Sequence, residues 1–183
     1  FQLIEKLFGV VFHQVDEVDI WHPDVEFYEI RDFDGQLRGQ LYLDLYARGR
    51  KRGGAWMDDL IGRRKKEDQI QIPVAFVVCN FASPVGKKPA QLTHSDVTTL
   101  FHEFGHALHH LLTRVDWLPV SGINGVAWDA VELPSQFMEN WCWEREVIDH
   151  ISEHIDTKAP LPQDLFDKMV AARNFQSAMQ MVR

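Results

Sequence analysis

The stretch THSDVTTLFHEFGHALHHLLT, residues 93–113, decides the fold of the second half of this chain and carries its chemistry. Thr93 and Asp96 have the spacing of a capping box, which marks the start of an α-helix. Seven apolar residues recur at helical spacing and predict one buried face. They are Val97, Leu100, Phe101, Phe104, Leu108, Leu111 and Leu112. The pattern therefore predicts an amphipathic helix over residues 93–113.

Inside this helix lies the sequence His102-Glu103-Phe104-Gly105-His106. Residues at i and i+4 share one face of a helix, so the two imidazoles can bind one metal ion. A glutamate directly after the first histidine can reach a metal-bound water and act as its base. The motif predicts one zinc ion per chain, held by His102 and His106, with Glu103 as the catalytic residue. The alternative is a pair of hydrogen-bonded core histidines.

A third zinc ligand must come from outside this helix. Glu132 is the candidate, because of its position in the sequence. It lies just before Pro134, which fits the first turn of a second helix, and the helix dipole alone could account for a carboxylate there. Glu139, two turns further on, is a candidate for orienting a ligating histidine. His109, one turn after His106, is a candidate for lining the cleft or supporting the site, whereas His110 reads as a surface or packing residue. The competing carboxylates are Asp116, Asp129 and Glu139.

A second zinc-like pattern, His150-Ile151-Ser152-Glu153-His154, matches the inverted motif His-x-x-Glu-His. That class needs a further glutamate ligand downstream, and no glutamate follows Glu153. The segment is also polar. We predict a solvated helix end here.

The composition of the chain limits the classes of partner that it is expected to bind. The chain has 183 residues, 45% hydrophobic and 25% charged, with a net charge of −8. That charge argues against a nucleic-acid partner, and the one basic run, Arg63–Lys66, is flanked by acidic residues and reads as a solvated turn. No apolar run approaches the roughly 20 residues of a membrane span, and no signal peptide is visible. Cys79 and Cys142 lie in apolar stretches and are predicted to be buried free thiols in a reducing compartment.

The first half, residues 1–90, is predicted to contain mainly strands and loops. A helix is expected over residues 1–9, and Asp34-Gly35 predicts a hairpin turn. The remaining expectations are strands Phe27–Ile30, Leu37–Ala47 and Ile72–Phe81, a short helix Ala55–Ile61 and a loop Pro84–Pro89. The strand Ile72–Phe81 is buried or at an edge, and an edge position would let it pair with a substrate backbone.

The second half, residues 91–183, is predicted to be helical and to carry the zinc. A helix is expected from Pro134 to about Ile151, and another beginning at Asp164. The loop Ser121–Gly125 is a candidate for a mobile part of the cleft wall. The fold class is α+β, with a small β-sheet followed by a helical zinc-binding half. The chain starts at Phe1 rather than at a methionine and ends in a helical pattern, so we expect a single fragment of a larger protein.

Four stretches go beyond a generic zinc motif: Leu100–His110, Trp128–Trp141, Asp44–Arg48 and Lys51–Trp56. They resemble the thimet oligopeptidase family of zinc metallopeptidases, and most closely its bacterial oligopeptidases. The resemblance covers nearly the whole chain, and these motifs are highly specific.

This resemblance implies a zincin-like catalytic core and a metalloendopeptidase that hydrolyses short peptides in the cytoplasm. It carries over His102, His106 and Glu132 as zinc ligands and Glu103 as the base. Members of the family are several times longer, and their oxyanion-stabilising groups come from a segment downstream of the zinc region. We therefore expect poor activity and self-association of this chain alone. The alternative is a zinc-binding domain without catalysis.

Overall fold

The computed structural model describes residues 1–86 and 88–182, with the side chains of residues 180 and 181 excepted. The chain divides into two compact units, Phe1–Glu139 and Asn140–Arg183. None of the helices in the described ranges combines the length and apolar character that a bilayer crossing requires.

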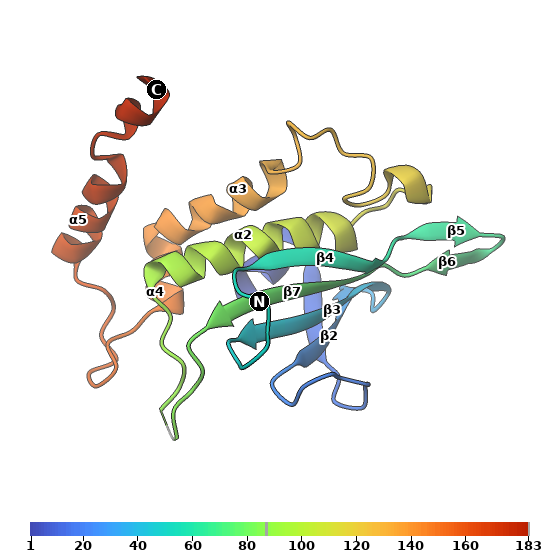
Figure 1. Cartoon of the computed structure of the whole chain (residues 1–183), viewed down its shortest axis with the longest axis horizontal. Helices are drawn as coiled ribbons and strands as arrows, with labels where there is room; N and C mark the ends of the chain where they lie inside the picture. The colour runs from blue at the N-terminus through green and yellow to red at the C-terminus, as the bar shows by residue number, and fades with distance from the viewer. Residues whose placement is uncertain (87, 183) are drawn as a thin grey trace. The chain divides into compact units, whose positions relative to one another are not determined.

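The first unit is built on a five-stranded mixed sheet with the order β1-β2-β3-β7-β4 (Figure 1). Neighbouring strands are antiparallel except for β3 and β7, which are parallel. The strands are β1 Val10–Gln14, β2 Glu26–Asp32, β3 Leu37–Tyr46, β4 Trp56–Ile61 and β7 Val74–Phe81. A separate two-stranded ribbon joins β5, Arg64–Lys66, to β6, Gln69–Gln71.

The sequence pattern explains the centre of this sheet. The predicted hairpin joins β2 and β3, and Gly35 supplies the positive φ of 85° that its turn needs. Leu41 and Leu43 of β3 are buried on one face, as their alternation predicts. Nearly every side chain of β7 is buried because this strand lies between two others and is covered by a helix.

Helix α2, His94–Leu111, packs between the sheet and the short helix α3, Leu133–Glu139 (Figure 1). The predicted capping box is present: the Asp96 backbone N–H donates to the Thr93 hydroxyl, and the Thr93 N–H donates to the Asp96 carboxylate. The apolar stripe of α2 faces the core, with Ala107 and Leu111 fully buried. The unit also contains α1, Gln2–Phe8, and a 3₁₀ turn η1, Leu118–Val120.

The second unit is helical. It comprises η2 Asn140–Trp143, α4 Arg145–Ile151, α5 Gln163–Asn174 and η3 Ser177–Val182. The inverted motif at residues 150–154 is exposed at the end of α4, as predicted. Cys142 in this unit and Cys79 in β7 are both buried, as predicted, and burial raises the pKa of the Cys79 thiol to about 12.

Three predictions about elements are wrong, and the structure decides between two alternatives for a fourth element. Residues 56–61 form strand β4 and not a helix, because pairing with β7 outweighs the weak local preference of a short segment. Of the two alternatives for the strand Ile72–Phe81, the buried one is confirmed: β7 is internal, so the free edge on this side of the sheet belongs to β4. The helix expected from Pro134 to Ile151 ends at Glu139, and Glu144, with extended backbone angles, starts α4 separately. Finally, Arg64–Lys66 of the basic run form the exposed strand β5 rather than a turn, and Arg63 is half-buried and pairs with Asp116. The loop expectation for residues 84–89 holds for its described part, and Lys87 lies outside the described residues.

Candidate metal centre

The helical motif places both histidines on one side of α2, near the start of α3. The rings of His102 and His106 lie 5.0 Å apart, nearly perpendicular to each other. Both side chains are partly exposed, whereas Glu103 between them is buried. The same turn of helix therefore offers two imidazoles to solvent and a carboxylate to the protein interior.

Glu132, the residue before α3, completes a cluster with these histidines. One oxygen of its carboxylate, Oε2, lies 3.2 Å from His102 Nε2 and 3.1 Å from His106 Nε2. Ligands of a tetrahedral zinc lie about 2.0–2.2 Å from the ion, which puts them roughly 3.3–3.5 Å from each other. The three residues also offer the imidazole and carboxylate donors that zinc prefers, and their ligand atoms lie within 4.8 Å of one another. The residues present therefore fit a zinc ion.

His102 is oriented by a second carboxylate. Its Nδ1 lies 2.6 Å from Glu139 Oε1, a charge-assisted hydrogen bond across the two helices. With Nδ1 donating to Glu139, Nε2 is left with its lone pair on the side of Glu132. This is the neutral tautomer that binds a metal through Nε2.

Glu103 lies against the edge strand β4. A backbone hydrogen bond from Met57 reaches its carboxylate. Burial raises the pKa of the Glu103 carboxyl, although the neighbouring histidines and the Met57 bond oppose this rise. Its carboxylate is thus held in a largely desolvated position beside the histidine pair.

Two residues that the sequence analysis did not identify, Ser135 and Gly105, set the position of Glu132. The Ser135 hydroxyl, fully buried, lies 2.8 Å from Glu132 Oε2 and from the Glu132 carbonyl oxygen. This hydrogen bond lowers the pKa of the Glu132 carboxyl, and the histidines contribute in the same direction. Gly105 lets α3 approach: a Cβ there would lie 2.5 Å from both Pro134 O and Ser135 Cα. A glycine inside a helix destabilises the helix by about 1 kcal/mol relative to alanine. The position of Gly105 in the predicted helix is therefore the one sequence feature that indicates a close contact there.

The other candidates lie outside this cluster. His109 lines an apolar groove between α2 and α3, and burial lowers the pKa of its imidazole. His110 is fully buried and bonds through Nε2 to the carbonyl oxygen of Ile61, a packing role. Asp116 pairs with Arg63 at 2.9 Å, and Asp129 is exposed.

Comparison with known proteins fits this geometry. The sequence model of Peptidase family M3 matches residues 1–183. The chain belongs to this family. Family M3 consists of metallopeptidases, and His102, His106 and Glu132 form a cluster that could hold a metal ion.

Curated relatives align with the chain over its full length or nearly so. Oligopeptidase A of Escherichia coli is 56% identical over 184 residues, covering 100% of the chain. A probable cytosolic oligopeptidase A of Arabidopsis thaliana is 44% identical, also over 100% of the chain. The dipeptidyl carboxypeptidase of Salmonella typhimurium is 38% identical over 99% of the chain. The chain spans 26–27% of the length of these relatives.

Proposed function

We propose that this chain is the zinc-binding part of an endopeptidase that hydrolyses short peptides. The observation that carries the proposal is the convergence of both histidine Nε2 atoms on one Glu132 oxygen, at 3.1 and 3.2 Å, beside the buried Glu103. The identity of 56% to an oligopeptidase A, against 38% to a dipeptidyl carboxypeptidase, supports an oligopeptidase rather than an exopeptidase.

In this proposal His102, His106 and Glu132 hold the zinc, and Glu139 and Ser135 orient two of these ligands. A bound zinc ion would lower the pKa of a water molecule and polarise the scissile carbonyl group. Glu103 would accept a proton from the attacking water molecule and would then return this proton to the departing amine nitrogen. The raised pKa of Glu103 suits a group that must both accept and return a proton.

The edge strand β4 is the proposed docking strand for the substrate. It is the terminal strand of the sheet, and its residue Met57 contacts the proposed base through the backbone. An extended peptide can add to such an edge by main-chain hydrogen bonds. We also propose a cytoplasmic setting, because a relative that is 44% identical to the chain is a probable cytosolic oligopeptidase A.

The ligand assignment is tested by metal analysis of the purified chain. We expect one zinc per chain and its loss in His102→Ala and in His106→Ala. Glu132→Ala should weaken zinc binding more than Asp129→Ala, an exposed carboxylate nearby, or Glu139→Ala. A zinc titration that ranks Asp129 or Glu139 first would overturn the choice of third ligand.

The base is tested in the full-length enzyme. Glu103→Gln should retain zinc but lose about 10²–10⁴-fold in peptide hydrolysis, because the proton acceptor is removed and the ligands are not. A chelator should abolish activity and added zinc should restore it. Undiminished hydrolysis by Glu103→Gln would favour the second candidate function, a zinc-binding domain without its own catalysis. This candidate also agrees with the short span of the chain, which covers 27% of the length of oligopeptidase A.

A further inference from the structure

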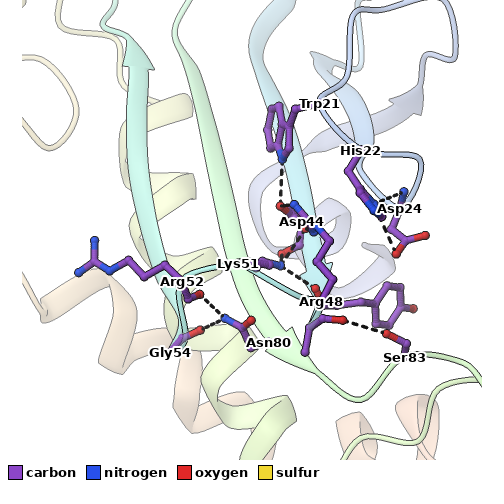
Figure 2. A network of polar contacts seen from close by, with 12 residues as sticks. Trp21, His22, Asp24, Asp44, Arg48, Lys51, Arg52, Gly54, Asn80 and Ser83 are labelled. Atoms are coloured by element: carbon purple, nitrogen blue, oxygen red, sulfur yellow. Dashed lines mark hydrogen bonds and ion pairs between the residues drawn. The ribbon is translucent and has the colours of Figure 1, made fainter.

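The connection between β3 and β4, residues 47–55, is fixed by a buried ionic cluster (Figure 2). At its centre is Asp44 in β3, whose side chain is only 3% exposed. Asp44 accepts hydrogen bonds from Trp21 Nε1 at 3.0 Å, from Arg48 at 2.6 and 2.8 Å, and from Lys51 at 2.8 Å. A carboxylate buried to this degree is retained only when such partners offset its lost hydration.

Lys51 ties the connection back to the strand from which it leaves. Its side chain is 4% exposed, and its ammonium group donates to Asp44 Oδ1, to the Asp44 carbonyl and to the Tyr46 carbonyl, each at 2.8 Å. An ammonium group has three protons to donate, so all of its donors are used. This leaves the backbone around Lys51 little freedom to change its position relative to β3.

The far end of the connection is held by β7. Asn80 Nδ2 donates to the carbonyl oxygens of Arg52 and Gly54, at 2.8 and 2.7 Å (Figure 2). Strand β4 begins two residues later at Trp56, and the next residue, Met57, hydrogen-bonds the Glu103 carboxylate through its backbone. The clamped connection thus leads directly into the peptide group that contacts the proposed base.

We propose that Lys51, Asp44 and Asn80 are positioning residues for the peptidase reaction: they set the start of β4 so that the Met57 amide holds Glu103 in place. The inference rests on the proposed role of Glu103. The polar cluster lies around the β3–β4 connection and contains none of the proposed metal ligands, so its effect on the reaction would be indirect. A displacement of about 1 Å in a reacting group can cost about 10²-fold in rate, so a clamp remote from the zinc has catalytic consequences.

Arg48 provides the matched control. It also binds Asp44, through two hydrogen bonds, but its side chain is 22% exposed and hydrogen-bonds no other residue in the part of the chain that the structure describes. Arg48→Met therefore removes a cation from the same carboxylate without releasing the connection. Lys51→Met removes a cation of equal charge together with the two backbone contacts.

The experiment measures amide hydrogen exchange at Met57 in the zinc-loaded protein. We expect exchange to be at least tenfold faster in Lys51→Met and in Asn80→Ala, approaching the rate in Glu103→Ala, where the acceptor is gone. Arg48→Met should leave the rate within twofold of the wild type. In the full-length enzyme, Lys51→Met and Asn80→Ala should lower kcat by about 10- to 100-fold while KM and zinc content stay unchanged.

The proposal is overturned by unchanged Met57 exchange in a folded Lys51→Met, or by an equal effect of Arg48→Met. Zinc loss or a change in KM alone would also overturn it, because a positioning role predicts neither. If Lys51→Met does not fold, Asn80→Ala, which buries no charge, decides the outcome. Activity retained by Glu103→Gln would instead refute the proposed function, whatever the exchange rates at Met57 are.

Discussion

At the scale of single residues, the geometry of the candidate metal centre depends on the missing side chain of Gly105 as much as on the proposed ligands. A Cβ at Gly105 would overlap Pro134 O and Ser135 Cα, which belong to the helix that follows Glu132. Gly105→Ala should therefore push α3 from α2, cost about 1–3 kcal/mol in the free energy of unfolding and weaken zinc binding about 10- to 100-fold.

Calorimetric zinc titration together with urea unfolding checks this prediction. The control is Gly49→Ala, since a Cβ at Gly49 meets nothing within 4 Å. Wild-type zinc affinity in Gly105→Ala would mean that the approach of α3 does not set the position of Glu132.

Asp44 predicts how stability depends on pH. Burial disfavours its ionised form, but the hydrogen bonds from Arg48, Lys51 and Trp21 outweigh burial and hold the pKa of Asp44 well below its usual range. On acidification the unfolded chain takes up this proton first, near the ordinary value of about 4, so the stabilisation is present above that pH and is lost as pH falls. The destabilisation caused by Asp44→Asn should therefore be largest at pH 7 and shrink below about pH 4.

Urea unfolding from pH 7 to pH 3 measures this difference. Asp68→Asn, in the exposed turn of the β5–β6 ribbon, is the control and should have little effect at any pH. A penalty for Asp44→Asn that grows on acidification would contradict the assigned ion pairs.

Among the site residues, the sequence predicted what a local pattern encodes. His102, Glu103 and His106 share one helix, so their spacing alone fixes their mutual placement. Glu132 needed the family resemblance, because the residues by themselves left three other carboxylates open. The contacts of Met57 and Ser135 could not be predicted, since each depends on how separate elements approach one another.

At the scale of elements too, local patterns were predicted correctly, whereas features that depend on pairing between distant segments were not. Helix α2 carries its own start signal and a long apolar period, and it begins where the capping box predicts. Strand β4 has neither: its six residues become a strand because β7 offers a partner. The continuation of α3 to Ile151 was also wrong, since Glu144 takes an extended conformation that a helical pattern does not reveal. The consequence is functional, because the free edge beside Glu103 belongs to β4 and not to β7, for which the sequence left a buried and an edge position open.

At the scale of the whole molecule, the unit Phe1–Glu139 contains all the residues proposed for zinc binding and proton transfer. It also leaves apolar surface open. A groove of about 610 Å³ between α2 and α3 has an almost wholly apolar lining. Phe8, Leu133 and Phe137 on this groove are 41%, 73% and 49% exposed. Exposed apolar patches of this kind favour association.

We therefore expect the 183-residue chain to bind zinc, to self-associate and to cleave peptides poorly. It spans only 27% of the length of oligopeptidase A of Escherichia coli, and the family resemblance assigns the oxyanion-stabilising groups to a segment downstream of the zinc region. Loss of one oxyanion donor typically costs about 10²–10³ in rate, and loss of the surfaces that orient the substrate adds to this. The measurement compares turnover per zinc of this chain and of the full-length enzyme on a short quenched peptide, with sedimentation velocity for the association state. Leu133→Ser with Phe137→Ser should reduce association without restoring turnover. Equal turnover of the two proteins would show that the zinc-binding segment suffices for catalysis.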